Sequence, residues 1–260
     1  MSDAAGQRRL TFVGAMRSAL AAAFFVCFGL GSAVLGFVLF PLLFVMGRGP
    51  RSRRNMRACV RLGYRLLVWA ARVMGLFRVE MSPEDRHALS NARGRIVVAN
   101  HISLIDVVIL MANLPDSTAV AKSAAGRNPF YSRIVSSVFL VNDDPLRVMD
   151  AAAELLSDGV NMVIFPEGTR TAPGTVRRLH RGAAQIALHS KAKVLCVGIS
   201  CDHHVLAKGQ PWWEAGERVV RYGLEVRGEI VPPALPKDGV SHSAAVALTN
   251  QIGQKLWPAK

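Results

Sequence analysis

The sequence predicts an α/β fold in which a mixed, largely parallel sheet is flanked by helices, with a membrane-associated helical segment at the N-terminus. Beyond residue 93, short β-branched runs alternate with helical stretches, which is typical of such sheets. The span 19–46 contains no charged residue, and a helix needs about 20 apolar residues to cross a bilayer. We therefore expect membrane-associated helices at 1–79 and an α/β domain at 80–260.

The positive charge of the chain is concentrated in the N-terminal segment. The formal net charge is +14, and the span from Ala4 to Val79 holds twelve arginines but no Asp or Glu. Such a charge usually indicates nucleic acid or anionic lipid as a partner. Because the arginines flank a long apolar run, we expect an anionic membrane surface as the partner and no nucleic acid.

The apolar run at 19–46 is compatible with two geometries. One is a single tilted helix that spans the bilayer, and the other is a kinked hairpin that enters and leaves the same leaflet, since three glycines and Pro41 interrupt the run. The denser arginine cluster follows the run, at 48–57, and the positive-inside rule predicts that this side is cytoplasmic. We expect the protein at the cytoplasmic (inner) membrane, with the α/β domain on the cytoplasmic face.

Residues 54–77 predict a basic amphipathic helix. Its arginines recur at intervals of three, four, four and seven residues and would form one stripe on a helix: Arg54, Arg57, Arg61, Arg65 and Arg72. With Trp69 and other apolar residues beside the stripe, the pattern is typical of a helix in the membrane interface. The alternative is a helix that packs on the α/β domain and keeps a solvated basic face.

Periodicity predicts the remaining elements. Strands are expected near 95–99, 118–122, 160–165, 193–199 and 218–227. Helices are expected near 103–112, 128–138, 146–157, 177–190 and 241–256. Functional residues of such sheets gather at the carboxyl ends of the strands.

Cysteine usage indicates a reducing compartment. The four cysteines, Cys27, Cys59, Cys196 and Cys201, have no disulfide-like or metal-like spacing. Two histidines follow Cys201 and Asp202, but no second cluster of ligands accompanies them. We therefore expect no metal and no bound cofactor.

The first candidate for chemistry is the pair His101 and Asp106. The apolar run at 96–99 predicts a buried strand that ends in Asn100 and His101, and an apolar helix starts soon afterwards. Asp106 should lie early in that helix, close enough to reach back to His101. An imidazole oriented by a carboxylate is the usual general base at neutral pH. The pair has no nucleophile of its own, so the attacking hydroxyl is expected to belong to a substrate.

The second candidate is the turn Pro166-Glu167-Gly168-Thr169-Arg170, which ends another β-branched run. The Arg170 guanidinium can hold a phosphate through two parallel hydrogen bonds, and the Gly168-Thr169 turn can add backbone N–H groups to the same oxygens. Glu167 is expected to orient a substrate hydroxyl, or otherwise to pair with Arg170 or with the nearby backbone.

In this order, Asn100-His101-x4-Asp106 and Phe165-Pro166-Glu167-Gly168-Thr169-Arg170 resemble the first and third blocks of the glycerolipid acyltransferase family. That family includes the bacterial 1-acylglycerol-3-phosphate acyltransferases. The resemblance covers about residues 95–200. It implies that 80–260 is an acyltransferase catalytic domain with the fold of this family.

The second block of the family is matched with one departure. Lys122 matches the Lys that commonly opens the block and is a candidate phosphate ligand, although an ordinary surface lysine would look the same. Asn142 stands where the block usually closes with an Arg, which removes one expected phosphate contact and suggests a different acceptor headgroup.

Three other stretches extend the resemblance. Arg181, which precedes Gly182, is similar to the basic residue that follows the third block and is expected to add positive potential to the site. In the fourth block, Cys196 takes the usual position of a proline. Residues 142–143, 181–184 and 208–212 resemble a subgroup associated with aryl-polyene and fatty-acid-type gene clusters.

The resemblance implies transfer of a fatty acyl group from acyl-CoA or acyl-carrier protein to the free hydroxyl of lysophosphatidate, a membrane lipid acceptor, giving phosphatidate. His101 would take the hydroxyl proton, Asp106 would orient His101, and Arg170 with Lys122 would hold the phosphate. Two alternatives remain: the same chemistry on another lyso-lipid, such as an amino-acid or polyene lipid, and a non-catalytic adaptor that binds anionic lipid. Acyl-chain length, the donor and the oligomeric state stay open.

Overall fold

The structure is a computed structural model of the chain. It describes residues 12–46, 49–122, 135, 137–142, 144–171, 178–203, 206, 207, 209–234 and 241–258. The elements follow one another as α1 (Phe12–Val34), η1 (Leu35–Leu39), α2 (Phe40–Met46), α3 (Pro50–Val73), β1 (Phe77–Met81), α4 (Pro83–Ser90), β2 (Ile96–Ala99), α5 (Asp106–Asn113), β3 (Ser117–Lys122), β4 (Leu140–Asn142), α7 (Pro145–Ser157), β5 (Asn161–Ile164), α8 (Gly182–Ser190), β6 (Val194–Cys201), β7 (Val220–Ile230) and α9 (His242–Leu256).

Within the described residues, seven strands form one sheet in the order β1-β7-β6-β2-β5-β3-β4. Every neighbouring pair is parallel except β6 and β7, which are antiparallel. The expected mixed, largely parallel sheet is therefore confirmed. Because β2, β3, β4, β5 and β6 run in the same direction, their carboxyl ends meet at one edge, where sites form in such sheets.

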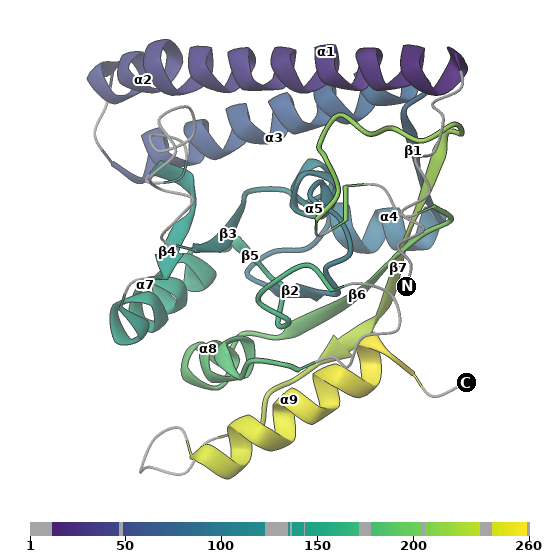
Figure 1. The fold of residues 1–260 in the computed structure, drawn as a ribbon. Coiled ribbons are helices and arrows are strands. Elements are labelled where there is room, and N and C mark those ends of the chain that lie inside the picture. Colours follow the sequence, from purple (N-terminus) through teal and green to yellow (C-terminus); the bar gives the residue numbers. More distant parts are fainter. Residues whose placement is uncertain are drawn as a thin grey trace, which may run out of the picture.

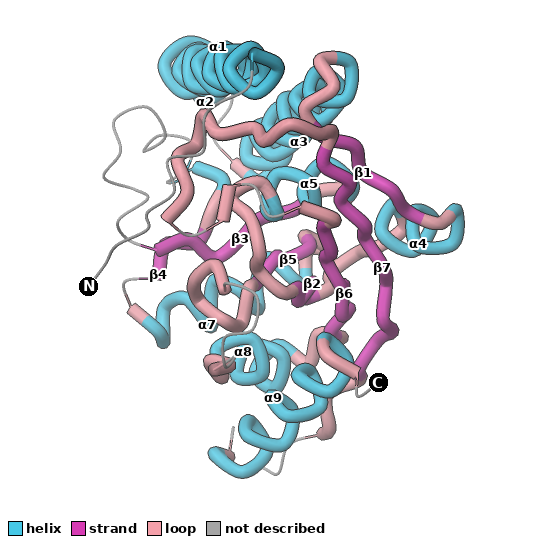
Figure 2. Tube along the Cα trace, turned by 45° about the vertical axis from the view of Figure 1, so that its right-hand side comes forward, coloured by secondary structure: helices cyan, strands magenta, loops and turns pink. Residues whose placement is uncertain are grey.

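Helices cover both faces of the sheet (Figure 1, Figure 2). Val97 and Ala99 of β2 pack in the core cluster that includes α3 and α5. Ile96 and Val98 pack in the cluster that includes α7, α8 and α9. Successive side chains of a strand point to opposite faces, so an uninterrupted apolar run such as β2 fits a strand that is covered on both sides.

The five expected strands are all present, and two more were missed. β4 is three residues long. β1 begins at Phe77, where the helix predicted at 54–77 was expected to continue. That helix, α3, ends at Val73 because Gly75 adopts a positive φ of +66°, a conformation that closes helices and favours glycine. The sheet therefore begins before residue 80, the expected start of the α/β domain.

The remaining helices follow the predictions with shifted starts. α5 begins at Asp106 and α8 at Gly182, a few residues later than expected. The polar stretch after Glu80, which carried no predicted element, forms α4, and its N-terminus is capped by Ser82, whose hydroxyl accepts a hydrogen bond from Asp85 N. Most of the helix predicted at 128–138 lies outside the described residues.

The apolar N-terminal run forms one continuous helix from Phe12 to Met46. Its π-helical turn, η1, accommodates Pro41: the N–H of Phe40 bonds to Leu35 O, five residues back, and the wider turn takes up the missing N–H of the proline. Within 19–46 the chain forms no hairpin, and it reverses only after Met46. The stretch Phe12–Val45 is long and apolar enough to cross a membrane.

Helix α3 lies between the long helix and the domain (Figure 1) and contacts α5. Its buried face is apolar and is formed by Met56, Val60, Leu67 and Ala71. Arg57 is also buried, and its Nε lies 2.5 Å from Oδ1 of Asp116, in the turn before β3. The predicted stripe is thus split, because Arg57 joins α3 to the sheet while Arg54, Arg65 and Arg72 are exposed.

Candidate active site

His101 and Asp106 meet at the carboxyl end of β2. The imidazole Nδ1 lies 2.9 Å from Asp106 Oδ2. Asp106 is fully buried at the first turn of α5, whereas the His101 side chain is 20% exposed. A neutral imidazole that donates from Nδ1 keeps its basic lone pair on Nε2. The predicted pair is therefore formed, with a base that a substrate can reach.

The carboxylate of Asp106 is fixed by the turn that it belongs to. Oδ2 also accepts hydrogen bonds from the backbone N–H groups of Ile102, at 2.7 Å, and Ser103, at 2.8 Å. Oδ1 is buried and has no hydrogen-bond partner among the described residues. The backbone N–H groups of the turn therefore hold the carboxylate in position against the imidazole.

Glu167 holds the backbone of His101 in place. Its Oε1 accepts a hydrogen bond of 2.7 Å from the backbone N–H of His101, and the residue is only 6% exposed. The bond joins the turn after β5 to the turn after β2. Of the roles expected for Glu167, the structure shows the one in which it pairs with the nearby backbone.

The imidazole ring is held in its plane by an aromatic neighbour. It stacks on Phe165, with ring centroids 4.3 Å apart and an interplanar angle of 22°. The carbonyl of His101 accepts a hydrogen bond from Thr171 N, at 2.8 Å. Asn100, just before it, exchanges two 2.7 Å hydrogen bonds with the backbone of Ile199 in β6. The segment after β5 and the strand β6 thus hold His101 and its backbone on both sides.

Gly168 is required where the Glu-Gly-Thr-Arg turn approaches His180. Its φ is +63°, and a Cβ there would lie 2.9 Å from His180 Cδ2. His180 N donates to Pro166 O, at 2.7 Å, so the two segments are tied together. A side chain at this position would be both strained and crowded.

A buried hydroxyl pair supports the turn that carries Asp106. Tyr222 Oη, on β7, donates to Ser103 Oγ at 3.0 Å, and both residues are almost fully buried. Burial raises the pKa of Tyr222, which keeps its phenol neutral and able to donate. Ser103 Oγ thereby accepts the hydrogen bond of Tyr222 and holds the turn that leads to Asp106.

Arg170 reaches a segment that the sequence did not connect with it. Its Nη1 donates to the carbonyl oxygens of Leu206, at 2.7 Å, and Ala207, at 3.1 Å. A guanidinium has five N–H donors, and the three on Nε and Nη2 are the ones with which it can receive a phosphate.

The remaining predicted site residues are Lys122, Thr169 and Arg181. Lys122 ends β3, and its backbone pairs with that of Asn142 at the end of β4, but its side chain lies outside the described part. Thr169 is exposed. Arg181 is exposed, and its Nη1 lies 2.8 Å from Nε2 of His242, at the start of α9, so the contacts of Arg181 lead away from the pair.

Sequence reasoning missed the supporting residues. Asn100 and Phe165 belong to the two motifs, but no role was predicted for them, and their positions next to the strand ends were the available signal. Tyr222 and Leu206 lie more than a hundred residues from His101 in the chain, and no local pattern marks them. Within the described residues no three His, Cys, Asp or Glu side chains gather as a metal site would require.

The fold and the site together are those of an enzyme, with a hydrogen-bonded His–Asp pair at the carboxyl end of a strand in a mixed sheet. The family model described as Acyltransferase matches residues 66–200, just over half of the chain. The chain therefore belongs to the acyltransferase family, as the motifs predicted.

Known proteins are similar to more than half of this chain. The human 1-acyl-sn-glycerol-3-phosphate acyltransferase alpha is 23% identical over 235 residues, which cover 85% of this chain and 76% of the relative. The 1-acyl-sn-glycerol-3-phosphate acyltransferase of Borreliella burgdorferi is 30% identical over 149 residues, 55% of this chain and 56% of the relative. The crystal structure of the 1-acyl-sn-glycerophosphate (LPA) acyltransferase PlsC from Thermotoga maritima superposes with a TM-score of 0.63 at 21% identity, over 95% of this chain and 99% of that one.

Proposed function

We propose that this chain transfers a fatty acyl group from a thioester, acyl-CoA or acyl-carrier protein, to the free hydroxyl of lysophosphatidate, producing phosphatidate. The observation that carries the proposal is the 2.9 Å contact of His101 Nδ1 with the buried Asp106, in a member of the acyltransferase family. The acceptor is suggested by the relatives, which are 1-acyl-sn-glycerol-3-phosphate acyltransferases.

In the proposed reaction, His101 Nε2 takes the proton of the acceptor hydroxyl while its oxygen attacks the thioester carbonyl carbon. Asp106 stabilises the imidazolium that forms. The tetrahedral intermediate then collapses, the C–S bond breaks, and the imidazolium returns the proton to the leaving sulfur. The products are an ester and a free thiol, so the scheme needs neither an acyl-enzyme nor a bound cofactor.

Arg170 is proposed to hold the phosphate of the acceptor with its Nε and Nη2 donors, and Lys122 to assist from the end of β3. Holding the acceptor in line with the thioester matters, because the correct placement of two reactants is worth about 7–11 kcal/mol. Arg181, whose Nη1 contacts His242 Nε2, is proposed to add positive potential to the site.

The N-terminal helices are proposed to hold the enzyme at the cytoplasmic face of the inner membrane. Apolar side chains are exposed along the whole long helix, including Phe12, Leu30 and Val45. On α3, an exposed apolar row adjoins the arginine stripe: Leu62, Leu66, Trp69 and Val73. A helix with apolar and basic faces side by side suits an anionic lipid surface, which is also where the acceptor resides.

The test is acyl transfer by the purified protein from acyl-CoA and acyl-carrier-protein donors to lysophosphatidate, with His101→Ala beside the wild type. We expect phosphatidate from the wild type and a rate about 10²–10⁴ lower in the variant, the usual contribution of a general base. Failure with every lyso-lipid, in protein that still binds liposomes, would instead favour a non-catalytic adaptor.

Asn142 supports a second class of acceptor as the alternative. It stands beside Lys122 at the ends of β4 and β3, where the resembling enzymes usually carry an arginine. Acylation of other lyso-lipids, such as an amino-acid or polyene lipid, without any phosphatidate would retain the chemistry and replace the acceptor.

A further inference from the structure

The segment from Leu206 to Arg218 joins the candidate active site to helix α1; the structure describes all of it except residue 208. On the catalytic side, Leu206 O accepts from Arg170 Nη1, at 2.7 Å, and from the backbone N–H of Leu104, at 3.1 Å. Leu104 lies in the turn between His101 and Asp106. One carbonyl thus ties the arginine to the turn that carries the catalytic pair.

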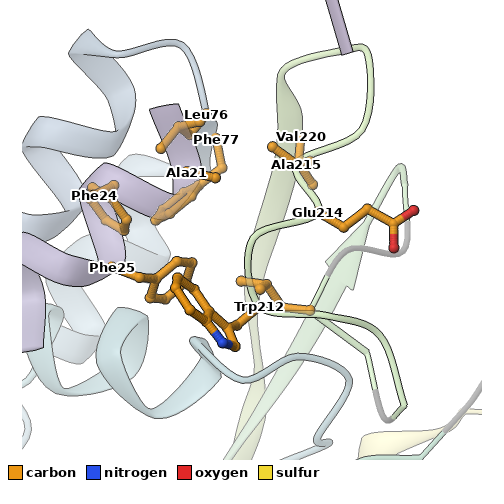
Figure 3. Close-up of a pocket in the computed structure, with 10 residues that line it drawn as sticks. Ala21, Phe24, Phe25, Leu76, Phe77, Trp212, Glu214, Ala215 and Val220 are labelled. Atoms are coloured by element: carbon orange, nitrogen blue, oxygen red, sulfur yellow. The ribbon is translucent and has the colours of Figure 1, made fainter. Parts of the chain in front are cut away.

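On its other side the same segment is held by α1. Arg17 donates from Nε to Gly216 O, at 3.1 Å, and from Nη2 to Arg218 O, at 2.8 Å. The rings of Phe25 and Trp212 meet edge to face, with centroids 5.9 Å apart. Figure 3 shows these two rings at the apolar pocket between α1 and the segment. These contacts link residues that are about 190–200 positions apart in the chain.

The contacts of the segment with α1 can fix the position of Arg170, because the first residues of the segment are themselves held in place. Leu206 has a φ of +57°, which residues other than glycine rarely adopt, and its side chain is buried at the pocket. Ala207 N donates to Gln210 Oε1, at 3.0 Å, and Gln210 N donates to Ala207 O, at 3.2 Å. Such a strained conformation persists only while its surroundings impose it, and α1 forms part of those surroundings.

We propose that Arg17 and Trp212 are positioning residues for Arg170: α1 holds the segment, and the segment holds the guanidinium with Nε and Nη2 directed to the phosphate of the acceptor. This inference rests on the proposed function. An arginine that is already oriented loses less side-chain freedom when it binds. Loosening of the segment therefore weakens binding of the phosphate group. It leaves proton transfer at His101 unchanged, because Glu167 and Asp106 hold the turn through their own hydrogen bonds to its backbone.

The experiment measures acceptor and donor kinetics of the full-length protein for Arg17→Ala and Trp212→Ala, with Arg78→Ala as the matched control. Arg78 is an exposed arginine on β1 and takes no part in the segment. We expect the KM for lysophosphatidate to rise about fivefold to twentyfold in both variants, with kcat and the donor KM within about twofold of the wild type. The control should match the wild type in all three constants.

A second measurement separates positioning from general damage. In an Arg170→Ala background, Arg17→Ala should add no further loss, because the group that it positions is already gone. With monoacylglycerol, an acceptor without phosphate, Arg17→Ala and wild type should react equally. An additive double variant, or an unchanged lysophosphatidate KM in both single variants, would overturn the inference. The proposed function itself fails separately, if the wild type makes no phosphatidate or His101→Ala keeps its rate.

Discussion

At the scale of single residues, the contact of Glu167 separates the roles that its position in the motif suggested. A carboxylate in a Pro-Glu-Gly-Thr-Arg turn suggested contact with a substrate hydroxyl, but its Oε1 instead accepts from the His101 N–H. The side chain is directed toward the protein and is nearly buried. This hydrogen bond fixes the backbone from which the imidazole projects.

Glu167→Gln is predicted to keep most activity, within about tenfold, since the amide oxygen of glutamine can accept the same hydrogen bond. Glu167→Ala leaves the His101 N–H without its acceptor, which costs about 1–3 kcal/mol of stability, and displacement of the base costs about 10² in rate. The measurements are kcat and thermal unfolding of the two variants. Equal, large rate losses with unchanged stability in both would indicate that the charge of Glu167 acts on the substrate.

Cys196, in β6, supplies a pH dependence. Burial raises the pKa of this thiol to about 11, although Lys255 opposes the shift. An unfolded cysteine has a pKa of about 8.5, so between these values the folded chain holds a proton that the unfolded chain has lost. Stability contributed by the buried thiol is therefore present below about pH 8.5 and falls as the pH rises toward 11.

Unfolding free energies measured from pH 8 to pH 11 should show this difference. We predict that Cys196→Ala loses about 3 kcal/mol less than the wild type across the window, at about 1.4 kcal/mol for each pKa unit. Cys27→Ala, on an exposed position of α1, is the control and should follow the wild-type profile. Parallel profiles for wild type and Cys196→Ala would contradict the prediction.

Most of the residues that the sequence identified share one property: each lies at or soon after a predicted strand end, whereas Arg181 lies within a predicted helix. His101, Asp106 and Arg170 were found for this reason, and the pairing of His101 with Asp106 is a contact between near neighbours in the chain. The contacts of Arg170 and Arg181 could not be predicted, because Leu206 and His242 come from distant segments that meet only in the folded sheet.

At the scale of elements, α3 is attached to the sheet by a buried ion pair. Arg57 contacts Asp116 through Nε at 2.5 Å and through Nη2 at 3.4 Å. Arg54 approaches the same carboxylate only at 3.8 Å and is 76% exposed. Arg54 and Arg57 lie on one turn of α3, but only Arg57 is desolvated enough for the loss of its partner to be costly.

Asp116→Ala is therefore predicted to lower stability by about 3 kcal/mol, because it leaves Arg57 buried and unpaired. Arg54→Ala, the matched control, should cost no more than about 0.5 kcal/mol, as expected for an exposed pair. Chemical denaturation of the detergent-purified protein measures both. A similar small change in the two variants would show that the pair is solvated and does not secure α3.

Elements were predictable in proportion to their burial and length. β2, β5 and β6 are continuous apolar runs, and both of their faces are covered, so sequence and structure agree closely. β1 alternates apolar and charged residues over five positions at the edge of the sheet, and β4 has three residues. Such short edge strands carry too little hydrophobic signal to be separated from turns, although the alternation in β1 was visible.

At the scale of the whole molecule, both ends of the long N-terminal helix are attached to the rest of the protein. Near its start, Arg17 binds the carbonyls of Gly216 and Arg218. Near its end, Leu43 O accepts a hydrogen bond of 3.0 Å from Ser52 Oγ, in α3. If the helix crossed the bilayer, its two ends would lie on opposite sides of a hydrocarbon layer about 30 Å thick. The two sets of contacts, which attach both ends to the rest of the protein, could not then both be kept.

We therefore predict that the helix lies along the membrane surface, with both of its ends on the cytoplasmic side. Single cysteines at Ala15 and Asn55, two exposed positions close to its two ends, should both react with a membrane-impermeant maleimide added to inside-out vesicles. The background is Cys27→Ser, which removes the exposed native thiol, and the unmodified background protein reports labelling of the other cysteines. In right-side-out vesicles neither introduced cysteine should react until the membrane is opened. Labelling of Ala15→Cys from one side and of Asn55→Cys from the other would establish a spanning helix, and would require the contacts of Arg17 with the 206–218 segment to break in the membrane.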